Sequence, residues 1–317
     1  MGVISYFYGV IIIPGKVLAM MNEFKLLVFH KVATEGSFSK AAEELYVSQP
    51  AVTKQINSLE NELGIKLFER NNKGIVLTAA GKLFSEHAGV ILAQFRRLKN
   101  DMSLLSEQVS GELTIGASTT IAQYVLPPVL ALFRQANPSL KLTLLNENSG
   151  TIENLLQRHE INLGIIEGLP NNSALQYTLF IKDELVLITH KTSIYHRLET
   201  CSLNDLRKSD LVLREKGSGT LEVFEDFIRQ YGLNLNEMNT LIQLGSTESI
   251  KLFLKHADAI GIVSIQAVKE DVMNGEFRVI ELEEGRIFRN FYFIHLKGTP
   301  EKLVSNFISF LKNRYNI

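Results

Sequence analysis

Three polar side chains near residue 50 have the chemistry and the spacing to contact nucleic acid bases. Gln49 and Thr53 are one helical turn apart, and Lys54 follows directly. On a helix, residues at this spacing share one face. A glutamine amide can pair with adenine in the major groove of DNA, and a lysine can contact phosphate or guanine. The set therefore predicts a DNA-contacting face, and a solvated helix face is the alternative.

Two short helices joined by a tight turn, over residues 39–63, would hold this face. Ser48 is expected to cap the second helix, and Pro50 falls in its first turn, where a missing N–H costs little. Small residues give the first helix a closely packing inner face, and a stripe of apolar residues gives the second helix its buried face. These inner residues are Ala41, Ala42 and Leu45 in the first helix, and Val52, Ile56, Leu59 and Leu63 in the second.

The segment 65–78 predicts two short strands around a turn at residues 71–74. Asparagine and glycine tolerate the positive φ that tight hairpin turns need. Such a wing would bring cations to phosphates or to the minor groove, and a solvated hairpin tip is the alternative. The residues assigned to the DNA interface are Ser48, Gln49, Pro50, Thr53, Lys54, Arg70 and Lys73.

Farther along the chain, hydroxyl, glycine and basic residues follow four predicted strands, just before a helix in each case. Ligands of α/β sheets bind at the carboxyl ends of strands, where helix N–H groups and hydroxyls can bind anions. We therefore expect these junctions to converge on a small anion between two lobes; the alternative is that each hydroxyl only caps its own helix. The residues assigned to this effector site are Ser118, Thr119, Thr120, Thr151, Arg214, Ser218, Gly219, Thr220 and Thr247.

The chain after Gly111 alternates short apolar segments with amphipathic ones, which indicates an α/β domain with a largely parallel sheet. The expected strands are 113–117, 140–146, 163–167, 184–190, 211–213, 241–244, 260–264 and 291–295. The expected helices are 129–135, 152–159, 221–231, 249–256, 267–274 and 301–313. We expect one lobe of about 111–181 and 286–317, and a second of about 182–285.

A long helix from Thr78 to about residue 108 should join the two parts. Its apolar residues alternate spacings of four and three, and this 3.5-residue period predicts a coiled-coil seam and a dimer on a two-fold DNA site. The seam residues are Phe84, Ala88, Ile91, Phe95, Leu98, Met102, Leu105 and Val109. The expected domains are a DNA-binding domain (21–78), a linker and dimerisation helix (79–110) and an effector-binding domain (111–317).

The composition is that of a globular protein: 45% of the 317 residues are hydrophobic and 21% are charged. The net charge of −1 leaves room for a small DNA-binding domain offset by an acidic remainder. Cys201 is the single cysteine, which fits a reducing cytoplasm and excludes an intramolecular disulfide. No catalytic, nucleotide-phosphate or metal-ligand spacing appears, so we expect no enzyme activity, cofactor or metal.

Residues 1–20 differ from the rest of the chain. Their apolar run, 3–13, is too short to span a bilayer, and the first cation, Lys16, follows the run instead of preceding it. We expect that translation starts near Met21 and that residues 1–20 are an upstream extension. A leader that touches a membrane is the alternative.

Residues 24–81 contain the runs A-A-x-x-L-x-V-S-Q-P-A-V, L-E-x-x-L-G-x-x-L-F-x-R and L-T-x-x-G. On these motifs the chain resembles the LysR-type transcriptional regulators, and the resemblance continues more loosely to the C-terminus. It implies a winged helix-turn-helix, a dimerising linker helix and a two-lobed effector domain similar to periplasmic binding proteins. Members of the family are commonly tetramers.

The resemblance also carries over individual residues. DNA contacts carry over to Gln49, Pro50, Thr53, Lys54 and Lys73. Effector contacts carry over to Ser118, Thr119, Thr120, Thr151 and the loop 214–220. Many members have arginine where this chain has Lys54, which lacks the planar fork for a bidentate contact. The segments GASTTIAQYVLP and REKGSGT are similar to the branch that regulates sulfur assimilation and carbon fixation, where an arginine usually stands in place of Leu221.

These features together predict an effector-gated transcriptional regulator with double-stranded promoter DNA, a small anionic effector, RNA polymerase and further copies of itself as partners. Effector binding between the lobes would shift the dimer or tetramer geometry, and with it the DNA bend. A solute-binding protein that uses only the α/β part is one alternative, and an enzyme in that part is another.

Overall fold

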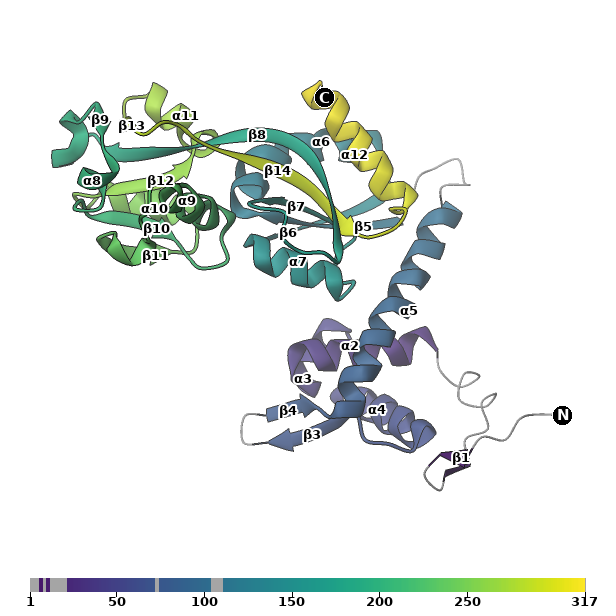
Figure 1. Cartoon of the computed structure of the whole chain (residues 1–317). Helices are drawn as coiled ribbons and strands as arrows, with labels where there is room; N and C mark the ends of the chain where they lie inside the picture. Colours follow the sequence, from purple (N-terminus) through teal and green to yellow (C-terminus); the bar gives the residue numbers. More distant parts are fainter. Residues whose placement is uncertain (1–5, 8–9, 12–21, 72–73, 104–110, 317) are drawn as a thin grey trace. The chain divides into compact units, whose positions relative to one another are not determined.

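The computed structural model describes residues 6–7, 10–11, 22–71, 74–103 and 111–316, and the chain divides into two compact units, 1–99 and 100–317 (Figure 1). Of the first 20 residues, only the strands β1 (Tyr6–Phe7) and β2 (Val10–Ile11) are described, and they pair antiparallel. Lys73, Leu105 and Val109 lie outside the described residues, so the roles predicted for them stay predictions.

The first unit contains the predicted helix-turn-helix and wing. Its elements are α2 (Glu23–Glu35), α3 (Phe38–Glu44), α4 (Gln49–Leu63), β3 (Phe68–Asn71), β4 (Gly74–Leu77) and α5 (Ala79–Ser103). The Ser48 hydroxyl accepts the Ala51 amide and caps α4, and Pro50 lies in the first turn. Gly64, in the left-handed region at φ 68°, ends the helix. The predicted capping of α4 is therefore confirmed.

The core of the first unit joins all of its helices. Val52, Ile56 and Leu59 of α4 pack with residues of α2, α3 and α5. On α2, Leu26, Val28, Phe29 and Val32 are buried, whereas Phe24 is 41% exposed. The ring of Phe29 contacts that of Phe84 in α5, with centroids 4.7 Å apart.

Glu60 fixes the wing to the second helix of the helix-turn-helix. Its buried carboxylate accepts the backbone amides of Leu67 (2.9 Å) and Phe68 (3.3 Å) and pairs with Lys66 (2.5 Å). Burial alone would raise the pKa of Glu60, but these three donors outweigh burial and lower the pKa below its ordinary value. One side chain of α4 thus sets where β3 begins.

The predicted seam on α5 divides into two parts. Ala88 and the neighbouring Leu92 are buried in the core of the first unit. In contrast, Phe95, Leu98 and Met102 are 36%, 58% and 58% exposed. The first part therefore stabilises the DNA-binding unit itself, and the second part presents an apolar stripe.

The second unit is built on one mixed sheet with strand order β11-β10-β12-β8-β14-β7-β5-β6, and β13 pairs with β8 and with β9. Its strands are β5 (Gly111–Ser118), β6 (Leu140–Glu147), β7 (Leu163–Glu167), β8 (Leu175–His190), β9 (Thr200–Cys201), β10 (Leu211–Arg214), β11 (Thr240–Leu244), β12 (Ile260–Ser264), β13 (Phe277–Leu282) and β14 (Ile287–Leu296). Its helices and helical turns are η1 (Ile121–Val125), α6 (Leu126–Ala136), α7 (Ser149–Gln157), η2 (Ile194–Arg197), α8 (Leu203–Leu206), α9 (Gly219–Gln230), η3 (Leu235–Glu237), α10 (Thr247–Leu254), α11 (Ile265–Met273) and α12 (Lys302–Tyr315).

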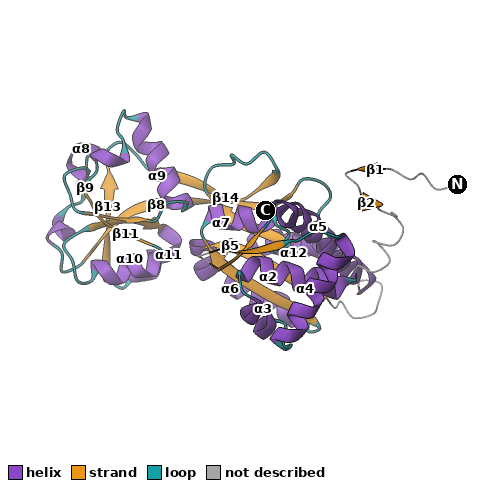
Figure 2. Cartoon of the chain, turned by 90° about the horizontal axis from the view of Figure 1, so that it is seen from below, coloured by secondary structure: helices purple, strands orange, loops and turns teal. Residues whose placement is uncertain are grey.

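The sheet forms two lobes with helices on both faces of each. In lobe 1, the cores place α6 and α12 on one face of β5, β7 and β14, and α7 on the other. In lobe 2, α8 and α9 cover one face, and α10 and α11 cover the other, as Figure 2 shows. Every predicted strand and helix of this unit is present, whereas β9, β13 and the first half of β8 were not predicted.

The expectation of a largely parallel sheet holds only within parts of each lobe. The strand pairs β5–β6, β5–β7, β10–β11 and β10–β12 are parallel. The long strands β8 and β14 pair antiparallel with each other and with β12 and β7, respectively. They run through both lobes, so the chain crosses between lobes inside strands instead of in loops.

The two lobes meet closely where α9 of lobe 2 begins. A Cβ atom at Gly219 would lie 2.1 Å from the backbone oxygen of Glu167, which ends β7 in lobe 1. Only glycine allows this approach. Within the described residues, no helix is long and apolar enough to cross a membrane.

We predict that Glu60→Gln lowers the free energy of unfolding of the first unit by about 1–3 kcal/mol at pH 7, because the two amides lose a charged acceptor. A carboxyl whose pKa is lowered by folding stabilises above its ordinary pKa and loses that contribution as pH falls through the folded pKa. The difference from wild type should therefore shrink on acidification. Hydrogen exchange at Leu67 and Phe68 measures it, with the exposed wing residue Glu69→Gln as the matched control; equal protection in both variants would contradict it.

We predict that Gly219→Ala destabilises the second unit by about 1–3 kcal/mol, because the methyl group must push α9 away from Glu167. Gly245→Ala is the matched control, since no atom lies within 4 Å of a Cβ placed there. Thermal unfolding of the two variants checks this prediction. Equal melting temperatures would show that the lobes can separate at this point without cost.

Candidate nucleic-acid interface and effector site

The polar face of α4 is preorganised by its own side chains. Gln49 and Lys54 are exposed, and Thr53 is half-buried. The Gln49 amide Nε2 donates to Thr53 Oγ1 (3.0 Å), and the same hydroxyl donates to the Gln49 carbonyl (3.1 Å). Asn57, one further turn along, is exposed on the same face and was not predicted, although its spacing of four from Thr53 was a usable signal.

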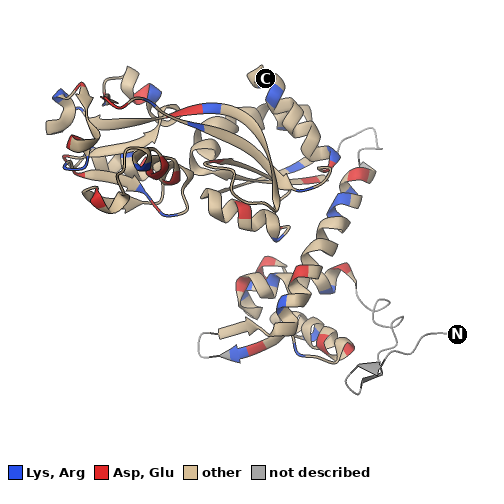
Figure 3. Cartoon of the chain, in the orientation of Figure 1, with Lys and Arg blue, Asp and Glu red and all other residues tan. Residues whose placement is uncertain are grey.

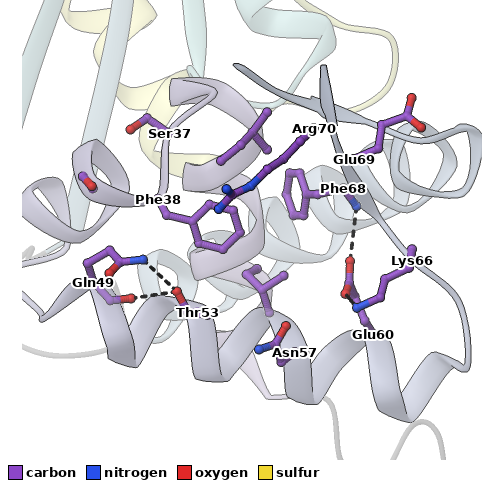
Figure 4. A pocket seen from close by; sticks show the side chains of 13 residues that line it. Ser37, Phe38, Gln49, Thr53, Asn57, Glu60, Lys66, Phe68, Glu69 and Arg70 are labelled. Carbon is purple, nitrogen blue, oxygen red and sulfur yellow. Dashed lines mark hydrogen bonds and ion pairs between the residues drawn. The ribbon is translucent and has the colours of Figure 1, made fainter. Parts of the chain in front are cut away.

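A cavity of about 440 Å³ lies between this helix face and the wing, as Figure 4 shows. Gln49, Thr53 and Asn57 line it from α4, and Figure 4 shows the guanidinium of Arg70 reaching across it from β3 toward Phe38. Phe38 and Phe68 line the same cavity beside these polar and cationic groups. The structure thus brings Arg70 together with the predicted face of α4.

Two exposed cations, Lys54 of α4 and Arg70 of β3, lie at this face. Figure 3 shows Lys and Arg interspersed with Asp and Glu over the described residues instead of gathered into one basic coat. Lys54 and Arg70 are therefore expected to carry a large share of the phosphate attraction.

In the second unit, three of the predicted effector residues surround a buried charged cluster instead of capping helices. The Ser118 hydroxyl donates to the carboxylate of Glu167, and Thr120 donates to the same carboxylate at 3.4 Å. The Nη1 atom of Arg289 lies 3.3 Å from Glu167 Oε1 and donates to Thr220 Oγ1 at 2.8 Å. This cluster joins the ends of strands in lobe 1 to the start of α9 in lobe 2.

Arg289 also pairs with a second buried carboxylate, that of Asp183. Its Nε atom donates to Asp183 Oδ2 at 2.7 Å, and the Ser264 hydroxyl donates to the other oxygen at 2.8 Å. Burial raises the pKa of Asp183, and Arg289 and Ser264 only partly offset it. Asp183 lies on β8 and Arg289 on β14, the two strands that cross between lobes.

Arg214 forms a second junction between the lobes. Its buried guanidinium donates from Nη2 to Thr119 of lobe 1 (3.2 Å) and to the Gly245 carbonyl of lobe 2 (3.3 Å). The side chain also pairs with Glu215 at 2.8 Å. The Nη1 atom has no hydrogen-bond partner among the described residues. A buried, charged donor without a partner is a costly feature that a ligand could satisfy.

The remaining predicted effector residues have local roles in the described structure. Ser218 caps α9 by accepting the Thr220 amide, and Asn148, the cap of α7, accepts the Thr151 amide. Thr247 is buried at the first turn of α10, whose cap is Ser246. A backbone bond from Gly150 to Gly217 (3.4 Å) links two of the predicted junctions directly. All four junctions thus come together at the lobe interface.

A further interlobe contact that was not predicted involves Tyr124. Tyr124, in the π-helical turn η1 of lobe 1, donates its hydroxyl to Glu248 of α10 in lobe 2. Lys251 pairs with Glu248 (2.9 Å) and lies 5.7 Å from the centre of the Tyr124 ring. Burial and Glu248 raise the pKa of Tyr124, so its proton stays in place at neutral pH. No local sequence pattern signals a contact between residues this far apart in the chain.

Cys201 does not have the environment of a reactive thiol. It is 3% exposed, and burial together with nearby acidic groups raises its pKa to about 11. The described residues also contain no group of three or more potential metal ligands.

Comparison with known proteins identifies the two units. Residues 25–82 match the family model of the bacterial regulatory helix-turn-helix protein, lysR family, and residues 106–316 match the LysR substrate binding domain. The chain is 29% identical over 293 residues to the HTH-type transcriptional regulator CysL of Bacillus subtilis, covering 92% of this chain and 96% of CysL. It is 32% identical over 268 residues to a probable RuBisCO transcriptional regulator of Porphyra purpurea, covering 84% of each.

The fold is also that of a solved regulator. CbnR in complex with its target DNA matches with a TM-score of 0.65 and 23% identity, over 92% of this chain and 99% of that chain. Both relatives are named transcriptional regulators, and the name of the second refers to carbon fixation, as the REKGSGT and GASTTIAQYVLP segments predicted. The chain is therefore a regulator and not an enzyme. It belongs to the LysR family of DNA-binding transcriptional regulators, with a winged helix-turn-helix and an effector-binding domain.

Proposed function

We propose that the protein is a cytoplasmic regulator that binds a two-fold promoter site as a dimer or tetramer and is gated by a small anionic effector. The observation that carries the gating is Arg214, a buried guanidinium between the lobes with one unsatisfied nitrogen. An anion bound there would supply the missing acceptor and a second negative charge beside Glu215. The relatives support the regulatory role, and the site residues support the kind of signal.

The proposed DNA interface is the face of α4 with the wing. Gln49, held by Thr53, would contact a base in the major groove, and Lys54, Arg70 and Lys73 would contact phosphates. Ser48 and Pro50 place the first turn of α4 so that this face begins at the groove. Asn57 extends the face by one turn.

The proposed effector site lies between the lobes. An effector that contacts Thr119 from lobe 1 and Arg214 from lobe 2 favours one arrangement of the lobes, by no more than its difference in affinity for the two arrangements. The other residues of the site would shape its walls and hold the helix ends. They are Ser118, Thr120, Thr151, Ser218, Gly219, Thr220 and Thr247. The changed arrangement would then alter the spacing of the DNA-binding units, the DNA bend and the contact with RNA polymerase.

The exposed half of the α5 seam supports self-association. Phe95 and Leu98 are apolar, exposed and three positions apart, and Met102 follows on the next turn of the same helix. A second copy of α5 would bury this stripe. The alternative of a solute-binding protein that uses only the α/β part leaves both the stripe and the matched helix-turn-helix without a use.

We predict that Lys54→Ala weakens binding to the upstream region of the protein's own gene and makes the slope of log affinity against log salt shallower by about one, because one phosphate contact is lost. Fluorescence anisotropy at several salt concentrations measures the slope. Lys208→Ala, an exposed lysine of lobe 2, is the matched control and should leave the slope unchanged. If footprinting of the wild type shows no protected site at any salt concentration, the proposed DNA binding is wrong.

We predict that at least one small anion raises the melting temperature of the wild type selectively, because a ligand that binds only the folded state stabilises it. Sulfite, sulfate, thiosulfate and sugar phosphates are the probes. Arg214→Lys keeps the charge but replaces the guanidinium, including Nη1, with an ammonium group, so the affinity for that anion should fall by at least about tenfold, as expected when one or more bonds to a charged group are lost. Arg229→Lys, on the exposed side of α9, should not change it. Equal shifts in both variants would place the anion elsewhere.

A further inference from the structure

The position between Ser118, Thr120 and Arg289 has the donors that an anion needs, yet these donors are already engaged. Glu167 accepts both hydroxyls, and its Oε1 atom lies 3.3 Å from Arg289 Nη1. The Glu167 residue is 1% exposed, and the Arg289 side chain is fully buried. The carboxylate therefore sits where the donors of lobe 1 converge.

Each of the three guanidinium nitrogens of Arg289 has at least one hydrogen-bond partner. Nε bonds to Asp183 (2.7 Å), Nη1 bonds to Thr220 (2.8 Å) and Nη2 bonds to Thr120 (3.2 Å). One guanidinium thus balances two buried carboxylates, and no second cation is paired with either of them among the described residues. An external anion placed here would meet two negative charges in a poorly solvated site, beside a guanidinium whose three nitrogens already have protein partners.

We propose that Glu167 is a built-in anion that fills this position, excludes anionic effectors from it and confines anion recognition to Arg214. Glu167 is in this sense a specificity-determining residue. The inference deepens the proposed function and rests on it for the role of the effector site. Its physical content, that the chain supplies its own carboxylate ligand, can be tested without DNA.

The size of the missing group selects the probe. Glu167→Ala removes one methylene and the carboxylate, which together have the heavy atoms of acetate. The variant keeps the hydroxyls of Ser118 and Thr120 and the guanidinium of Arg289, so a vacated anion site remains. Acetamide has the same shape without the charge, and chloride at equal ionic strength controls for general salt effects.

The experiment is thermal unfolding of the full chain in sodium acetate, acetamide and sodium chloride. We expect Glu167→Ala to melt below the wild type, and acetate on the order of 100 mM to raise its melting temperature by about 3 °C more than either control. The wild type should show no such difference. Glu147→Ala, which removes an exposed carboxylate at the end of β6, is the matched variant and should also show none.

The inference is overturned if acetate raises the melting temperature of Glu167→Ala no more than acetamide or chloride does. It is also overturned if acetate raises the melting temperature of the wild type equally. If Glu167→Ala does not fold in chloride, the yield of folded protein becomes the measure. Recovery in acetate alone supports the inference, and equal recovery, or none in any solution, overturns it. Rescue by acetate in a protein that protects no DNA would uphold this inference while refuting the proposed function.

Discussion

The second unit depends on a single buried guanidinium, that of Arg289, which must balance Glu167 and Asp183 at once. Buried charges are costly unless they are paired and fully hydrogen-bonded, and here Ser118, Thr120, Thr220 and Ser264 complete the bonding. The partners come from both lobes and from both strands that cross between them. The lobes are therefore connected through one buried cluster, in which removal of a partner leaves a buried charge uncompensated.

This constraint explains why regulation through lobe movement is physically reasonable. A buried ionic cluster has a well-defined geometry and gives discrete arrangements instead of a continuous range. The Arg214 junction differs, because one of its guanidinium nitrogens has no hydrogen-bond partner among the residues that the structure describes. Under the proposed function, one junction would hold the lobes together and the other would respond to the effector.

Local sequence patterns predicted the elements well, because helix caps and apolar periodicity act over a few residues. Ser48 and Pro50 marked the start of α4 correctly. The same patterns could not place β13 or the first half of β8, whose pairing depends on the partners β8 and β14, far apart in sequence.

In the candidate sites, too, local sequence patterns predicted some features and missed others. The face of α4 was predictable, since Gln49 and Thr53 are neighbours on one helix. The hydroxyls of Ser118, Thr120 and Thr220 were noticed, but their partners Glu167, Asp183 and Arg289 were not, because an acid at the end of a strand gives no local sign of the arginine that will meet it. The hydroxyl donors suggested that an anion binds beside them, and in the structure the carboxylate of Glu167 lies there.

The most direct test of the cluster's role is the distance between the lobes in solution. Pulsed electron resonance between two spin labels would report this distance. The labels would be attached to cysteines that replace the exposed residues Gln135 in lobe 1 and Lys208 in lobe 2, in a protein whose buried cysteine is removed by Cys201→Ser. If the cluster holds the lobes, the wild type should give one narrow distance and Glu167→Gln a broader or shifted distribution. The same narrow distribution in both proteins would contradict this role of the cluster.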